Sequence, residues 1–159
     1  MIYNSFILPH FTYCLEIWGN TYQTLLDPIF RLQKKFVRLI TFTDFNAHSE
    51  PLFNQLNVLN IFQLSKFSSC IFVYDLRNNR YPHNIEKYFD RPIHTYQNRS
   101  ASSGNFRPPS IKLTITQHNF KYAATKHWNS LPSHLKINMS RQQFKNELRN
   151  YILNSTHQP

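Results

Sequence analysis

The 159-residue sequence contains only two glycines, and this scarcity excludes several kinds of site. Rossmann and P-loop phosphate sites need several glycines, because their backbone must approach the phosphate closely. Cysteine is equally scarce: Cys14 and Cys70 form no CxxC pair, so no zinc finger or zinc knuckle is encoded. A disulfide between the two is an open alternative, but the apolar sequence around each favours two buried thiols in a reducing compartment. We expect neither a metal nor an organic cofactor.

Acidic residues are also few, with 8 Asp and Glu against 18 Lys and Arg. The formal net charge is therefore +10, and the pI is near 9.8. This balance favours a polyanionic partner, most often nucleic acid, because each phosphate that a cation neutralises releases counterions. Net charge alone is weak support, since many basic proteins only stay soluble through it. The positions of the cations along the sequence are therefore needed to indicate a binding face.

The sequence also lacks a long uninterrupted apolar run. Residues 1–18 are rich in apolar side chains, but Asn4, Ser5, His10 and Glu16 interrupt them and argue against a membrane span. The same stretch has neither a basic leading segment nor a small-residue cleavage site, so we do not expect it to be a signal peptide. We therefore expect a nuclear or cytoplasmic protein that is neither secreted nor bound to a membrane.

The clearest positive signal is an amphipathic helix predicted at residues 25–40. Asp27 and Pro28 suit the first turn of a helix. Apolar residues recur every three or four positions and predict a core-facing side: Leu25, Ile29, Leu32, Phe36, Leu39 and Ile40. Cations recur at the same spacing on another face: Arg31, Lys34, Lys35 and Arg38. That face presents four positive charges to a negative partner, or it is simply a solvated basic face.

Helical patterns occupy much of the remaining chain. Residues 2–18 predict a helix that is apolar nearly all round and therefore buried, with Pro9 kinking it or marking its start. Because the chain opens directly on such a helix, we expect that residues normally packing ahead of Met1 are missing. Further helices are predicted at residues 49–56, at 61–77 after an Asn60 cap, at 85–89, at 119–129, and after a capping box of Ser140 and Gln143.

One segment predicts β-structure. Residues 91–110 are rich in Pro, Ser, Asn and Arg, which is typical of a loop. Residues 110–116 then alternate apolar and polar side chains, which predicts a strand, and residues 94–100 are its natural partner. The resulting exposed hairpin would carry three more cations: Arg99, Arg107 and Lys112. A surface loop without a partner is the equal alternative.

The patterns together predict a mainly α fold, an irregular array of about five to seven helices with one small β-hairpin arm. We expect a helical region at residues 1–90 and the loop and hairpin arm at 91–117. A C-terminal helical region at 118–159 is expected to pack on the first.

Three landmarks stand in a particular order along this chain. They are an S-x-x-x-P-x-x-x-Y-x-x-x-x-W-G stretch, an L-Q-K-K-x-x-R-x-I stretch, and a W-N-S-L-P turn followed by an F-K-x-x-L helix. This order resembles the region beyond the polymerase palm in non-LTR (LINE-type, jockey-like) retrotransposon reverse transcriptases, over nearly the whole chain. The matching residues are Ser5, Pro9, Tyr13, Trp18, Gly19, Leu32, Gln33, Lys34, Lys35, Arg38, Ile40, Trp128, Asn129, Ser130, Leu131, Pro132, Phe144, Lys145 and Leu148.

The departure from that family concerns its catalytic carboxylates. Polymerase activity there depends on palm aspartates, two of them adjacent, because two divalent ions must hold the attacking and leaving oxygens. No two acidic residues are adjacent in this sequence, and Asp75 lies inside a helical pattern where a structural role is expected. The resemblance therefore implies a non-catalytic fragment, the thumb and the segment beyond it, without palm or fingers. We do not expect an enzyme.

In that family the thumb grips template and nascent duplex, which implies a role for the cations. The four of the basic helix would contact backbone phosphates of RNA, DNA or an RNA–DNA hybrid, and those of the hairpin would add secondary contacts. Tyr96 and Phe106 would stack on unpaired bases or, as we favour, close the hairpin. Gln33 is expected to be a polar residue of the helix face. The missing palm and fingers region is a second expected partner.

Two alternatives to nucleic-acid binding stay open. The first is a structural or protein-interaction remnant that associates through an exposed apolar first helix, with Phe6, Phe11 and Trp18 as contacts. The second is a fragment without a selected function. His127 and His134 flank the W-N-S-L-P turn, but no cysteine or carboxylate cluster lies near them in sequence, so we expect packing histidines rather than metal ligands.

Overall fold

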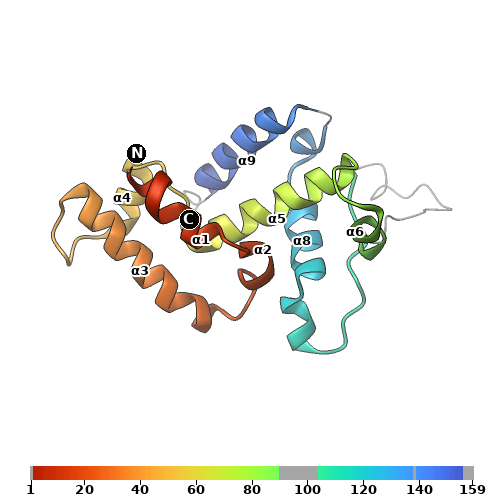
Figure 1. Ribbon diagram of the computed structural model, residues 1–159, viewed down its shortest axis with the longest axis horizontal. Helices are drawn as coiled ribbons and strands as arrows, with labels where there is room; N and C mark the ends of the chain where they lie inside the picture. The colour runs from red at the N-terminus through yellow and green to blue at the C-terminus, as the bar shows by residue number, and fades with distance from the viewer. Residues whose placement is uncertain (1, 90–103, 138, 156–159) are drawn as a thin grey trace. The chain divides into compact units, whose positions relative to one another are not determined.

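A computed structural model describes residues 2–89, 104–137 and 139–155, and none of these residues lies in a β-strand (Figure 1). The mainly α prediction is confirmed. The α-helices of the described residues are α1 (Leu8–Thr12), α2 (Leu15–Trp18), α3 (Gln23–Thr41), α4 (Ser49–Gln55), α5 (Ile61–Arg77), α6 (His83–Tyr88), α8 (Phe120–Asn129) and α9 (Arg141–Ser155). Single turns of other helix types are η1 (Tyr3–Ile7), η2 (Thr114–His118) and η3 (Ser133–Lys136).

The chain divides into two compact units, Met1–Ser65 and Lys66–Pro159, and the boundary falls within α5. The regions expected from the sequence, 1–90, 91–117 and 118–159, stay predictions.

The N-terminal segment of the first unit is broken, whereas one buried helix was predicted. It consists of η1, α1 and α2, and the break lies at Cys14, whose φ of 50° is left-handed. Pro9 lies in the first turn of α1, where its missing N–H leaves no bond unmade. The expectation of burial all round is wrong, because several large side chains are exposed: Ile2, Phe6, Tyr13 and Ile17.

The core of the first unit lies between η1, α3 and α4. The buried residues that form it are Tyr3, Val37, Leu52, Phe53 and Val58. Since α3 begins at Gln23, two residues before the expected start, Pro28 lies within the helix and not in its first turn. Pro28 is exposed, where the hydrogen bond that it removes can be replaced by water.

Gln33 is the polar centre of this unit, and the prediction of a surface role is wrong. Its side chain is 0% exposed. Its Nε2 donates to the Tyr3 hydroxyl (2.6 Å) and to the Leu59 carbonyl (3.0 Å), while its Oε1 accepts from the Ile61 amide (2.9 Å). One side chain of α3 therefore ties η1 and the start of α5 to the core.

Aromatic packing organises the second unit. The Tyr74 ring of α5 stacks on the Phe144 ring of α9 with centroids 4.3 Å apart, and the Trp128 ring of α8 lies 5.9 Å from Phe144. Phe72 contacts Phe120 edge to face at 4.8 Å. These rings join α5, α8 and α9 into one core.

The helix caps agree with the sequence. Asn60 and Gln63 each accept from the other's backbone amide at the start of α5, both at 2.9 Å. Ser140 and Gln143 make the same exchange before α9, at 3.0 and 3.3 Å. The Asn119 side chain accepts from the Lys121 amide at the start of α8. The predicted starts of these helices are confirmed.

The predicted strand at residues 110–116 is wrong. The segment from Pro108 is irregular and turns into η2 at Thr114, and Leu113 and Ile115 are exposed. Pro108 and Pro109 remove two adjacent backbone donors, which disfavours a ladder here. The proposed partner strand at 94–100 lies outside the described residues.

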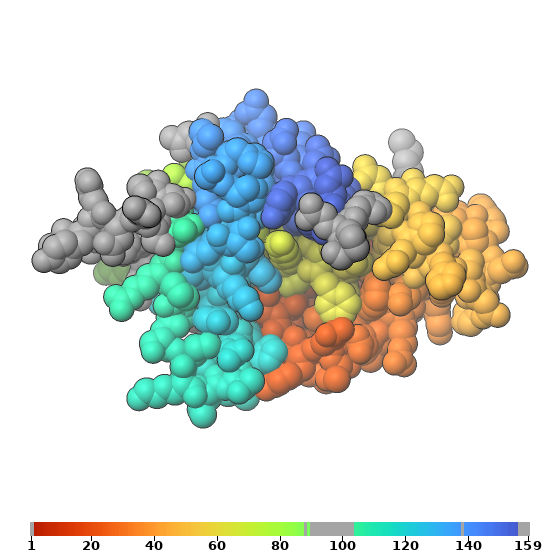
Figure 2. Space-filling view, turned by 180° about the vertical axis from the view of Figure 1, so that it is seen from behind, coloured from red at the N-terminus to blue at the C-terminus, as the bar shows by residue number. Residues whose placement is uncertain are grey.

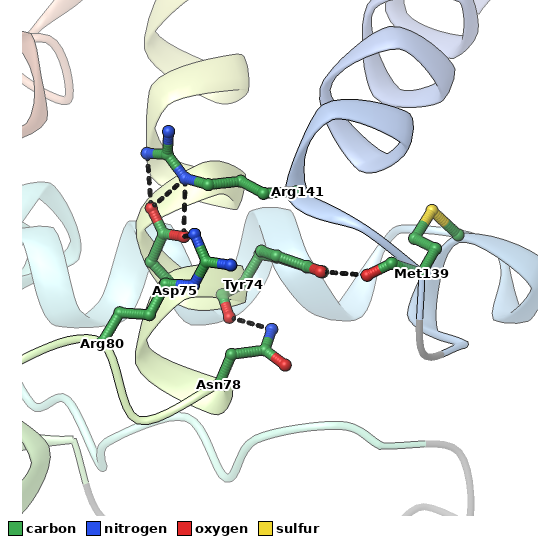
Figure 3. Close-up of polar contacts among 6 residues, drawn as sticks. All are labelled: Tyr74, Asp75, Asn78, Arg80, Met139 and Arg141. Atoms are coloured by element: carbon green, nitrogen blue, oxygen red, sulfur yellow. Dashed lines mark hydrogen bonds and ion pairs between the residues drawn. The ribbon is translucent and has the colours of Figure 1, made fainter.

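Asp75 has the structural role expected from its helical setting (Figure 3). The Arg141 guanidinium holds its carboxylate in two places, with Nε 2.9 Å from Oδ1 and Nη2 2.7 Å from Oδ2. Arg80 approaches Oδ1 at 3.6 Å. Beside this pair the Tyr74 hydroxyl donates to the Met139 carbonyl. A charged pair and a hydroxyl thus fix the start of α9 to α5.

Candidate nucleic-acid interface

The cationic face of α3 is the predicted site, and its four cations differ in their contacts. Arg31 and Lys35 are exposed and lie one helical turn apart on the same face. Within the part of the chain that the structure describes, neither side chain pairs with a carboxylate. Both charges are therefore open to an anion from outside the unit.

The other two cations of the helix also serve the unit itself. The Lys34 ammonium lies 4.1 Å from the centroid of the Phe30 ring, a cation–π contact on the edge of the core. The Arg38 Nε donates to the Ala47 carbonyl at 2.8 Å and so holds the loop between α3 and α4. Both side chains are half-buried. Arg31 and Lys35 are thus the better placed pair for an external phosphate.

The cations expected on the hairpin belong to the second unit. Arg107 and Lys112 are exposed in the irregular segment that leads into η2. Arg99 lies outside the described residues. Arg107 and Lys112 are therefore carried by a loop of the second unit and not by a hairpin.

The aromatic residue beside Arg107 is not an open stacking platform. Phe106 is half-buried, with its ring edge to face with Trp128 at 6.4 Å. Its amide donates to Asn129 Oδ1 at 3.0 Å, and Asn129 Nδ2 donates to its carbonyl at 2.8 Å. The Trp128 indole donates to the Gly104 carbonyl at 2.9 Å. Phe106 therefore packs against α8 and does not close a hairpin, so the preferred interpretation is wrong for Phe106. Tyr96 lies outside the described residues.

The sequence analysis did not predict these contacts of Trp128 and Asn129 with residues 104–106, although both residues stand in the W-N-S-L-P turn. Tryptophan has a side-chain donor, and asparagine has both a donor and an acceptor. At the end of a helix, each can therefore hydrogen-bond to the backbone of a neighbouring segment. Gly104 has φ +67°, and a Cβ there would come within 3.1 Å of Arg77 Nη1. The turn thus closes the segment 104–106 onto α8.

The apolar side of α3 is rotated from its expected position. The residues buried on it are Leu26, Gln33 and Val37, whereas Leu25, Leu32 and Leu39 of the predicted core face are exposed. The signal was present in sequence, because Leu26, Gln33 and Val37 follow helical spacing with Phe30 between them. A glutamine in that row concealed it, since an amide is buried only when its hydrogen bonds are made.

The histidines and cysteines form no reactive cluster in the described part of the chain, where no three metal-ligating side chains come together. His127 is half-buried, and burial, with Lys66 and Lys126 adding to it, lowers its pKa to about 4. Its Nδ1 is buried without a hydrogen-bond partner. Burial raises the pKa of Cys70 to about 12, whereas Cys14 is exposed, so the expectation of two buried thiols is wrong for Cys14.

Comparisons with known proteins do not indicate a function for this chain. No family model, curated protein or solved structure matches the chain. The retrotransposon resemblance and the roles that it implies stay predictions. Among the helices of the described residues, none is long and apolar enough to cross a bilayer.

Proposed function

We propose that this chain binds nucleic acid through the phosphate backbone, without reading sequence and without catalysis. The observation that carries the proposal is the pair Arg31 and Lys35, exposed on one face of α3 without a carboxylate partner in the described residues. Such side chains position a nucleic acid by neutralising its phosphates. RNA, DNA or an RNA–DNA hybrid is the partner class, with Arg107 and Lys112 as further contacts. The motif order supports the wider proposal of a non-catalytic reverse-transcriptase fragment whose parent palm and fingers it would contact.

The expected affinity is modest. Sequence-independent binding through a few phosphates gives dissociation constants of roughly 10⁻⁴ to 10⁻⁶ M at physiological salt. Lys34 and Arg38 contribute less than the exposed pair, because the Phe30 ring and the Ala47 carbonyl already hold part of each side chain. Charge at the exposed pair should therefore dominate the effect of mutation.

Charge reversal of the exposed pair tests the proposal. Arg31→Glu/Lys35→Glu is compared with Lys87→Glu/Lys126→Glu, which changes the net charge equally at exposed positions of the second unit. Fluorescence anisotropy with a labelled RNA–DNA hybrid should show a loss of at least about tenfold for the first variant and a much smaller loss for the second. Equal losses would mean that net charge alone attracts the hybrid, and the α3 assignment would be abandoned.

A second candidate is a protein-interaction remnant that associates through the N-terminal helices. It is favoured by the exposed apolar side chains of η1 and α2, above all Phe6 and Ile17. Phe11, named for this role from sequence, is buried, and Trp18 is half-buried. If this candidate holds, sedimentation should show self-association that Phe6→Ser/Ile17→Ser removes and that Arg31→Glu/Lys35→Glu leaves unchanged.

A further inference from the structure

A row of exposed leucines runs along α3 beside the cations. Leu25, Leu32 and Leu39 are 61%, 47% and 69% exposed, and they follow one another at intervals of seven residues. Seven residues are nearly two helical turns, so the three side chains form a ridge about 21 Å long. Ile29 and Phe36, both half-buried, lie between them. We call these five residues the leucine ridge.

The unit's own packing accounts for only part of the leucine ridge: the Phe36 ring meets the buried Phe11 ring edge to face at 6.3 Å, whereas Leu25, Leu32 and Leu39 stay exposed. The fully buried residues of α3 are Leu26, Gln33 and Val37, and they lie on an adjacent side of the helix. Exposure also extends past the helix end, where Phe42 is 96% exposed. The loop that follows α3 lies at the surface in the space-filling view (orange to yellow, at the right of Figure 2).

The spacing of the leucine ridge identifies the shape that fits it. Alternating intervals of four and three residues are the pattern by which one helix receives another, with side chains of each entering holes of the other. A flat or irregular surface would not require this register. The ridge therefore suits a second amphipathic helix that brings its own apolar stripe.

The cations beside the leucine ridge indicate the charge of the helix that would bind there. Lys35 borders the leucine ridge, and Arg31 and Arg38 follow on the same flank. Asp27, the one acidic residue of α3, is half-buried. A second copy of this chain would bring cations against cations, which opposes pairing, whereas acidic residues flanking an apolar stripe would meet them favourably.

We propose that the leucine ridge of α3 docks an acidic amphipathic helix from another protein. Its apolar stripe covers Leu25, Leu32 and Leu39, and its carboxylates pair with Lys35 and Arg31. This goes beyond the proposed function, because nucleic acid does not use the leucines. Since both ligands use the same two cations, the acidic helix and a nucleic acid exclude one another on α3.

The test uses the full chain and a labelled 21-residue peptide with Leu at its a and d heptad positions and Glu at e and g. The first variant, Leu25→Ser/Leu39→Ser, alters exposed ridge positions. Its matched control, Leu113→Ser/Ile115→Ser, makes similar apolar-to-polar changes at exposed positions of the second unit. A peptide with the same apolar stripe and Lys at e and g controls for charge.

Wild type and the Leu113→Ser/Ile115→Ser control should bind the acidic peptide, and the ridge variant should bind it at least about tenfold more weakly while binding the RNA–DNA hybrid as wild type does. The hybrid should also displace the peptide. Equal binding of the lysine peptide, or of the ridge variant, would overturn the proposal. So would ridge-dependent dimers, or ridge-dependent binding to phosphatidylserine vesicles without peptide binding. Failure of the nucleic-acid proposal is distinguishable, because it appears as absent hybrid binding with peptide binding intact.

Discussion

Replacing Gln33 by leucine should strongly destabilise the Met1–Ser65 unit, because this one buried amide satisfies three polar groups. They are the Tyr3 hydroxyl, the Leu59 carbonyl and the Ile61 amide, at 2.6, 3.0 and 2.9 Å. Leucine is similar in size and apolar, so the substitution removes the bonds without opening a large cavity.

The magnitude follows from two opposing terms. A buried polar group left without a partner costs about 1–3 kcal/mol, and three such groups are created together. Burial of a leucine side chain returns roughly 1.5–3 kcal/mol. The polar term is larger, so we expect the free energy of unfolding to fall by about 3–4 kcal/mol. This is a large share of the stability of an ordinary domain, about 5–15 kcal/mol.

Urea unfolding and amide hydrogen exchange measure the effect. Exchange at the Ile61 amide should accelerate along with the global change, because that amide loses its acceptor. Gln23→Leu is the matched control: the same chemical change at an exposed position of the same helix should stay within about 0.5 kcal/mol. Tyr3→Phe should cost about 1 kcal/mol alone and less when Gln33 is already leucine. A Gln33→Leu protein as stable as the Gln23→Leu control would refute this reasoning.

Three further predictions follow from the packing. Arg141→Ala should lower the free energy of unfolding by about 1–2 kcal/mol, because the buried Asp75 carboxylate loses its bidentate partner. Solvent screens the half-exposed arginine and keeps the loss at this modest size. An unchanged urea midpoint would contradict this prediction. Because burial lowers the pKa of His127 from 6.5 to about 4, the unfolded chain takes up the proton first as the pH falls. Unfolding free energy should therefore drop between about pH 6.5 and 4 by on the order of 2 kcal/mol, and a His127→Phe protein should lack this part of the drop. Ellman's reagent should titrate one thiol, Cys14, in the native protein and a second, Cys70, only in urea; two fast native thiols would be inconsistent with this burial.

The helices that carry their own start signals could be predicted from sequence. α5 begins at Ile61 after the Asn60 cap, and α9 begins at Arg141 after Ser140. A cap is a local arrangement, so its residues reveal it whatever packs around the helix. The start of a capped helix could therefore be predicted in either unit, at α5 in the first and at α9 in the second.

The first unit was predicted less well, because its arrangement depends on contacts distant in sequence. The face that α3 buries is set by bonds from Gln33 to residues 26 to 30 positions away, and no local pattern shows them. The break at Cys14 needs a left-handed residue, for which cysteine is no signal. For the predicted α3 site, the sequence shows all four cations, but only the contacts show that Lys34 and Arg38 also hold parts of the first unit together.

The salt dependence of hybrid binding tests the central claim most directly. If Arg31 and Lys35 each neutralise a phosphate, replacing both by alanine should reduce the slope of log K against log salt concentration by about 1.8 for a duplex. Lys87→Ala/Lys126→Ala should leave the slope near that of wild type. We predict that the slope changes only for the α3 pair. An unchanged slope for that pair, or an equal change for the control pair, would contradict phosphate binding at this face.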